Sequence, residues 1–170
     1  MTNHTAPSRP DATATPVGAI VVGYDTSASS LAAVRRGISL ATQLHRDLRV
    51  VMAWTMPISF SGFPFTSWSP QEDAQQMLAH LGGILFPQGA PAFFSAVSIE
   101  GEAARVLINE SRGAEMLLVG SRGHGGFAGL FLSSVSSACA EHATCPVLIM
   151  RAHFSETHEV ESRMLVNASR

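Results

Sequence analysis

The residues best suited to bind a charged small molecule lie in residues 119–142, where a glycine-rich stretch joins an apolar run to a serine-rich segment. The apolar run ends at Val119, and the stretch after it reads Gly120, Ser121, Arg122, Gly123, His124, Gly125 and Gly126. Glycines allow backbone N–H groups to approach an anion closely, and a helix N-terminus adds the positive end of its dipole. A predicted helix begins further on, around Ser133, Ser134 and Val135. This order of strand, glycine loop and helix start predicts a phosphate-binding site.

Two other interpretations of the glycines stay open. They can serve a plain connection that needs glycine to turn. They also contain a dinucleotide-binding fingerprint that uses Gly123, Gly125 and Ala128, which would favour a flavin- or nicotinamide-dependent enzyme. That match is weak, because it follows the fourth predicted strand and no acidic residue closes a strand about twenty residues later.

Polar or aromatic residues also end two other predicted strands. Asp25 follows a buried apolar run and can accept hydrogen bonds from a ribose or a base, or simply cap the helix that follows. Trp54 ends the second predicted strand. Arg122 and His124 can meet a phosphate or face solvent.

Composition excludes several classes of function. The 170 residues suit a single domain, and the net charge of −2 gives no electrostatic case for nucleic acid. All eleven basic residues are arginines, which excludes a P-loop lysine and a Schiff-base lysine. We predict no catalytic residue and no metal site, because no nucleophile elbow is present and the histidines lack metal-ligand spacing. The two cysteines are expected to be reduced. Without a membrane span or signal peptide, the expected location is the cytoplasm.

Short apolar runs alternate with helical patterns along the chain. The runs that predict strands are residues 19–24, 48–54, 92–99, 115–120 and 146–150. A cap at Thr26 or Ser27 starts the first helix, and a capping box of Ser69 and Glu72 starts the second. The third helix is expected over residues 102–112 with Gly113 as its stop, and the fourth begins at Ser134. This alternation predicts βαβ units and an α/β fold whose parallel sheet is covered on both faces.

The predicted domain covers residues 17–151. Residues 1–16 are expected to form a disordered arm and residues 152–170 a tail, while residues 57–69 form a long aromatic loop. Asp25, Trp54 and the glycine stretch follow the first, second and fourth strands. In parallel α/β sheets ligands bind beyond the carboxyl ends of the strands, at the switch point, so these three segments are expected to meet.

Four segments resemble the universal stress protein family: IVVGYDTSASS, VVMAW, VSIEGEAARVLINESRGAEMLLVGSRG and LSSVSSACAEHATCPVLIM. They occur in the family's order over about residues 18–151. The resemblance implies a doubly wound five-stranded parallel sheet of the adenine nucleotide alpha hydrolase-like type, with strand order 3-2-1-4-5.

The family's nucleotide motif is a glycine, two residues, a glycine, nine residues, then a glycine and a hydroxyl residue. Gly120, Gly123 and Ser134 match, whereas Ser133 replaces the third glycine and Thr26 replaces the glycine after Asp25. By resemblance the ligand is ATP, AMP or another adenine nucleotide. Any Mg²⁺ would be held through the phosphates, and turnover would at most be slow. Asp25 would hold the ribose or base, and Gly23, Trp54 and Val119 would line the base.

The resemblance also implies a homodimer through the last strand, from Pro146 to Met150. A nucleotide-free dimer that acts through protein–protein interaction is the alternative, because Thr26, Trp54 and Ser133 each depart from the family's pattern. A Cβ at position 133 would crowd a phosphate if φ were positive there, and would do little if Ser133 were an ordinary helix cap.

Overall fold

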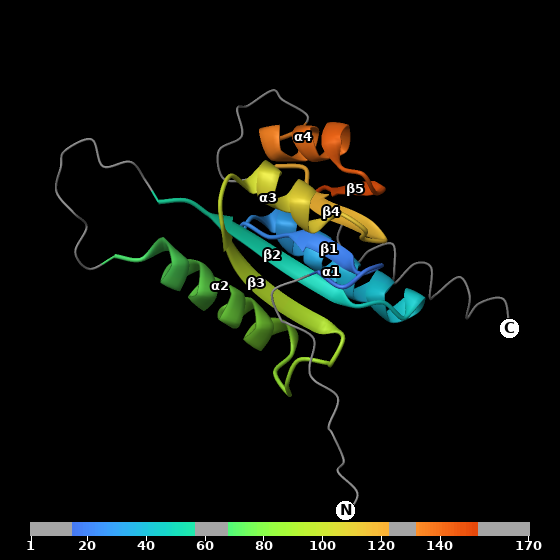
Figure 1. The fold of residues 1–170 in the computed structure, drawn as a ribbon. Helices are drawn as coiled ribbons and strands as arrows, with labels where there is room; N and C mark the ends of the chain where they lie inside the picture. Colours follow the sequence, from blue (N-terminus) through green and yellow to red (C-terminus); the bar gives the residue numbers. More distant parts are fainter. Residues whose placement is uncertain (1–14, 57–67, 123–131, 153–170) are drawn as a thin grey trace, which may run out of the picture.

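The computed structural model describes residues 15–56, 68–122 and 132–152, and these form a parallel sheet with helices on both faces (Figure 1). Most of the predicted arm, aromatic loop and tail lies outside these residues. The elements run in the order β1 (Ile20–Gly23), α1 (Ala28–Leu44), β2 (Leu48–Trp54), α2 (Pro70–Leu85), β3 (Phe94–Glu100), α3 (Ala103–Glu110), β4 (Met116–Gly120), α4 (Ser134–His142) and β5 (Val147–Met150).

The strand order is β3-β2-β1-β4-β5, and every pairing is parallel, which confirms the predicted topology. The chain winds outward from β1 to β3 in one direction and then crosses back to build β4 and β5 on the other side. The winding therefore reverses between β1 and β4, and this is the switch point of the sheet.

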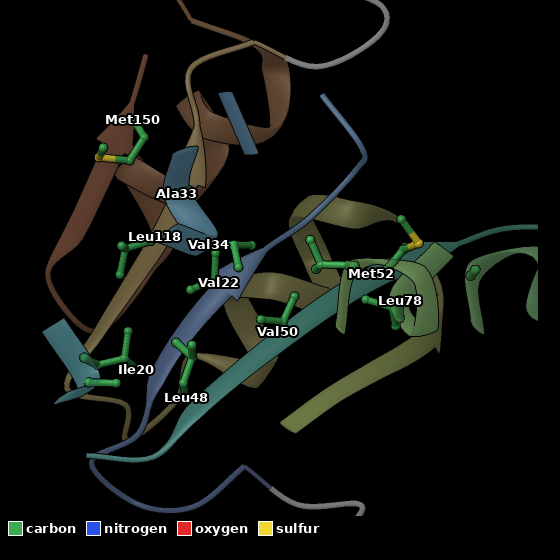
Figure 2. Packing of buried hydrophobic residues seen from close by; sticks show 13 residues of the cluster. Ile20, Val22, Ala33, Val34, Leu48, Val50, Met52, Leu78, Leu118 and Met150 are labelled. Atoms are coloured by element: carbon green, nitrogen blue, oxygen red, sulfur yellow. The ribbon is translucent and has the colours of Figure 1, made fainter. Parts of the chain in front are cut away.

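One face of the sheet packs against α1 and α2. Figure 2 shows Ile20, Val22, Leu48 and Val50 of the central strands in this layer, with Met52 beside Leu78 of α2. Gly37 allows α1 to approach closely, since a Cβ there would lie 2.7 Å from Val22 Cγ2. Alternate residues of each strand point to this layer, as the pleat of a strand requires.

The opposite face packs against α3 and α4, where Val21, Val51 and Leu117 join Cys139 in a second buried cluster. Both cysteines are free thiols, as predicted. Burial, with a smaller contribution from the neighbouring Cys145, raises the pKa of Cys139 to about 11. Cys139 is therefore a neutral core residue at physiological pH.

Helix ends agree with the predicted signals in most places. Ser27 and Ser69 cap α1 and α2, and each side-chain oxygen accepts from a backbone N–H three residues on. The third helix predicted over residues 102–112 is three residues too long: α3 covers Ala103–Glu110, Ser111 is its C-cap, and Gly113, at φ +75°, lies in the turn beyond. The helical spacing of Met77, Leu78, Leu81, Ile84 and Leu85 predicts one apolar stripe on α2, but Met77 and Ile84 are exposed.

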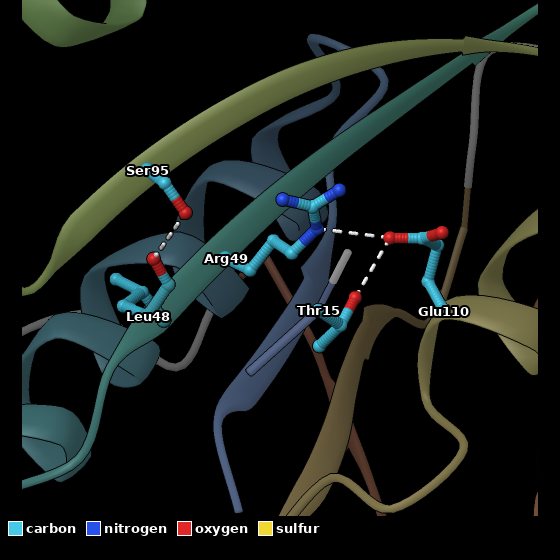
Figure 3. A network of polar contacts seen from close by, with 5 residues as sticks. All are labelled: Thr15, Leu48, Arg49, Ser95 and Glu110. Carbon is cyan, nitrogen blue, oxygen red and sulfur yellow. Dashed lines mark hydrogen bonds and ion pairs between the residues drawn. The ribbon is translucent and has the colours of Figure 1, made fainter. Parts of the chain in front are cut away.

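A buried ion pair links the second strand to α3 (Figure 3). The Arg49 side chain is only 4% exposed, and its Nε lies 2.9 Å from Glu110 Oε2. The same carboxylate oxygen accepts a 2.8 Å hydrogen bond from Thr15 Oγ1. A charge this deep in the protein is tolerated because an opposite charge and hydrogen bonds surround it.

We expect Glu110→Ala to lower the free energy of unfolding by about 3 kcal/mol, because the buried guanidinium of Arg49 loses its carboxylate. The matched control is Glu115→Ala, which removes the partner of Arg46 in a pair whose side chains are 48% and 41% exposed. That exposed pair is expected to contribute less than about 1 kcal/mol. Urea denaturation monitored by circular dichroism measures both variants, and equal losses would contradict the assignment.

Candidate functional site

Three predicted site segments meet at the carboxyl edge of the sheet. Gly23 ends β1, Gly120 ends the neighbouring β4, and Trp54 ends β2 on the other side of β1. The register of the sheet aligns Gly23 with Val51 and Gly120 with Met150. The switch point is therefore bordered by the three segments that the sequence pattern predicted to converge there.

The turn after β1 is built around the exposed carboxylate of Asp25. Its Oδ1 accepts hydrogen bonds from Ser27 N at 3.0 Å and from Ser27 Oγ at 2.6 Å. Between these residues Thr26 has φ +69°, a left-handed conformation that is rare for a β-branched residue. The backbone keeps the conformation that favours glycine although the residue is threonine. Replacement of the family's glycine by Thr26 therefore leaves this turn in a glycine-like shape.

The turn after β4 is bound to the start of α1 by serine hydroxyls. Ser29 Oγ donates to the carbonyl of Arg122 at 2.5 Å, and Ser27 Oγ, which donates to Asp25, lies 3.2 Å from the same carbonyl oxygen. The amide of Arg122 donates back to Ser29 Oγ at 3.4 Å. The role of Ser29 is not apparent from the sequence, since its partner lies 93 residues away and a serine near a helix start resembles an ordinary cap.

Several amides predicted to face an anion are engaged within the protein. Ser121 N donates to Met150 O at 2.7 Å, and Ser133 N donates to Ser121 O at 2.8 Å. Because Arg122 N also donates to Ser29 Oγ, the described part of the loop offers few amides to an anion. The first-turn amides of Ser134 and Val135 lie ahead of the first intrahelical bond of α4, from Ser137 N to Ser133 O. Among the described candidates, these two amides are the ones placed to meet an anion.

Ser133 is an ordinary helix cap. Its φ is −73°, and its Oγ accepts from Ser136 N at 3.1 Å. A glycine is not required by this backbone, because a negative φ suits any residue. Of the two possibilities left open for Ser133, the structure selects the cap.

The remaining described candidates pack within the protein. Gly23 and Gly120 are packing glycines: a Cβ at Gly23 would lie 2.7 Å from Leu107 Cδ1, and one at Gly120 would lie 2.8 Å from Ser30 N. Val119 is buried, and Val135 is half-buried against the cluster around Cys139. Gly123, His124, Gly125 and Gly126 lie outside the described residues.

Trp54 and Trp68 differ in how their indole N–H groups are satisfied. Trp68 Nε1 donates to Asp73 Oδ2 at 2.6 Å on the surface. Trp54 packs against the core layer beneath α2, and its buried Nε1 has no hydrogen-bond partner among the described residues.

Within residues 15–56, 68–122 and 132–152, no group of three or more His, Cys, Asp or Glu side chains could hold a metal ion. None of the helices in those same ranges is long and apolar enough to cross a membrane.

The model of the universal stress protein family matches residues 17–151. The chain belongs to the universal stress protein family. Universal stress protein Rv2623 of Mycobacterium tuberculosis is 33% identical over 136 residues, which are 78% of this chain and 44% of the relative. Universal stress protein Rv2624c of the same organism is 35% identical over 140 residues, or 78% and 48%. The chain thus spans about half the length of the curated relatives it matches.

Solved universal stress proteins share this fold. A universal stress protein crystallised in complex with cAMP is 25% identical, with a TM-score of 0.60 over 81% of this chain and 98% of that one. The universal stress protein of Archaeoglobus fulgidus in complex with dAMP has a TM-score of 0.56 at 18% identity, covering 78% and 97%. Structural neighbours of this universal stress protein domain therefore include adenine nucleotide complexes.

We expect Gly120→Ala to lower the free energy of unfolding by about 1–3 kcal/mol without any ligand, because the new Cβ would overlap the backbone of α1 at Ser30. The control is Gly82→Ala in α2, where a Cβ meets nothing within 4 Å. There the same substitution is expected to stabilise by up to about 1 kcal/mol through helix propensity. Chemical denaturation compares the two, and an unchanged stability of Gly120→Ala would refute the packing role.

Proposed function

We propose that this universal stress protein domain binds an adenine nucleotide, ATP or AMP, and acts as a regulatory module of the stress response. The observation that carries the proposal is the position of the α4 N-terminus and Asp25 on the two sides of the switch point, at the ends of adjacent strands β4 and β1. The complex of a 25% identical relative with cAMP supports the choice of an adenine nucleotide.

The donors and acceptors at this edge fit the parts of a nucleotide. The amides of Ser134 and Val135, at the positive end of α4, suit phosphate oxygens. The carboxylate of Asp25 is exposed and suits the hydroxyls of a ribose. Gly123 to Gly126 remain proposed phosphate ligands, and any Mg²⁺ would be held through the phosphates.

A regulatory role suits the chemistry better than an enzymatic one. The chain has no lysine to neutralise a transferred phosphoryl group. Among the described residues of this edge, no general base is evident beside Asp25. We therefore propose binding with at most slow turnover. The proposed location is the cytoplasm.

Calorimetric titration with ATP is expected to show saturable binding below millimolar concentration. Asp25→Asn is expected to weaken binding about 10-fold, because a neutral amide makes weaker hydrogen bonds to a ribose than a carboxylate does. Asp47→Asn is the control, since this exposed aspartate precedes β2 at the opposite edge of the sheet. An absence of binding at millimolar ATP, with an intact circular dichroism spectrum, would reject the proposal.

The second candidate is a nucleotide-free dimer that acts through protein contacts. It is favoured by the engagement of the Ser121 and Arg122 amides, which leaves fewer donors for phosphates. Ser133→Gly distinguishes the two candidates. If this variant bound ATP and the natural chain did not, the nucleotide-free function would be supported.

Both candidates include a homodimer through β5. This strand is at the edge of the sheet, and Leu148 is 37% exposed there, so an apolar edge is available for pairing. Leu148→Asp is expected to convert a dimer to a monomer in sedimentation equilibrium. The control Ile84→Asp changes a residue that is 57% exposed on α2, far from β5 in the sheet order, and is expected to leave the dimer intact. A natural chain that is monomeric would contradict the proposal.

A further inference from the structure

Strand β3 forms one edge of the sheet, and α2 lies alongside it (Figure 1). The strand pairs with β2 on one side, and among the described residues no further strand lies on its other side. Its seven residues, Phe94–Glu100, include no proline, lysine or arginine, and their one charge is at the last position. Natural edge strands commonly carry such residues to prevent pairing with another chain. This edge is therefore able to accept a further strand.

The hydrogen bonds to β2 show which backbone groups of β3 face outward. Directly after β3, Gly101 N donates to Trp54 O at 2.8 Å, so the odd-numbered residues of β3 direct their backbone groups toward β2. The even-numbered residues Ala96 and Ser98 consequently direct their N–H and C=O groups away from β2, toward the open edge. These are the groups to which an added strand would bond.

A groove of about 450 Å³ lies between this edge and α2. Its lining combines apolar side chains with an amide and a hydroxyl, and consists of Gln75, Leu78, Ala79, Ala96, Val97 and Ser98. Side chains of a strand alternate between the two faces of its sheet. A strand added to β3 would therefore place every second side chain on the face that α2 covers, within reach of this groove.

The groove lies in an acidic part of the chain. Residues 68–104 contain four carboxylates and no arginine or lysine, although the whole chain has eleven arginines. Phe86, the C-cap of α2, packs edge-on against Phe94 at the start of β3, with 4.8 Å between ring centroids. The helix and the strand thus run in opposite directions, and the exposed Glu72 and Glu100 share one end of the groove. Charge complementarity favours a basic partner at this end.

We propose that the β3 edge and the adjoining α2 groove form a docking site for a basic, extended segment of a protein partner, which joins the sheet as a sixth strand. The backbone groups of Ala96 and Ser98 bond to the segment, its alternate side chains enter the groove, and its arginine or lysine meets Glu72 and Glu100. This is recognition by strand addition. The site shares no residue with the proposed nucleotide site, so failure of one proposal leaves the other standing.

The probe is a fluorescently labelled synthetic peptide in which threonine and valine alternate between terminal arginines. Fluorescence anisotropy without nucleotide is expected to give a Kd of roughly 10–100 μM. A control peptide with glutamate in place of each arginine is expected to bind about 5-fold more weakly or worse, because its charges repel those of Glu72 and Glu100. Absence of saturable binding of the basic peptide up to about 1 mM would overturn the proposal.

Two tryptophan substitutions on α2 test the groove. Ala79→Trp places an indole in the groove and is expected to weaken binding of the basic peptide about 10-fold or more. Gln76→Trp is the matched control, since Gln76 is exposed on the same helix and does not line the groove. It is expected to leave binding unchanged. Equal binding by the two variants would contradict the location of the site.

Amide hydrogen exchange of Ala96 and Ser98 tests strand addition itself. In the free chain these outward-facing amides are expected to exchange fast, and bound basic peptide is expected to slow them roughly 10-fold. Unchanged exchange on binding would refute strand addition. Slow exchange without peptide would also overturn the proposal: it would assign the edge to a second copy if it rose with protein concentration, and to another segment of the same chain if it did not.

Discussion

The architecture of the carboxyl edge depends on the close approach of the α1 N-terminus to the end of β4. Gly120 makes this approach possible, because any Cβ there would overlap Ser29 and Ser30. Ser29 then uses one hydroxyl to bind both the carbonyl and the amide of Arg122. Since α1 follows β1 and Arg122 follows β4, this contact joins the two strands that border the switch point. The hydrogen bond from Ser133 N to Ser121 O holds the start of α4 at the same edge.

Most of the fold could be predicted from the sequence, because the strands are short and mostly apolar and α1, α2 and α4 each begin at a serine cap. Ser27 and Ser69 are examples in which the signal and its partner lie within three residues. The features that escaped prediction are non-local. Ser29 meets Arg122 only after the sheet has formed, and the exposure of Met77 and Ile84 depends on how much of α2 the sheet can cover. The strand order brings β2, β1 and β4 side by side, as predicted, but the direction of each amide and carbonyl beyond these strands could not be read from residue types.

The glycines of the candidate site illustrate how one sequence pattern can combine two physical requirements. Gly120 belongs to a motif associated with phosphate binding, yet its missing side chain is needed for packing against α1. Ser133 takes a position that is glycine in the motif and serves as a conventional cap at negative φ. Thr26 does the opposite, since it occupies a left-handed conformation without being glycine. Of these two departures from the family pattern, Thr26 has the backbone conformation that favours glycine and Ser133 does not.

Helix α1 is attached to β4 at both ends. Ser29 holds Arg122 beyond the carboxyl end of the strand, and at the other end Arg46, just past α1, pairs with Glu115 ahead of Met116. The two contacts set the position of α1, a helix of 17 residues, along β4, although the exposed ion pair contributes less than about 1 kcal/mol. The edge between β1 and β4 is consequently held by contacts within the protein, so a nucleotide bound there as proposed would meet a preformed border. Little of the binding free energy would then be lost to rearranging this part of the domain.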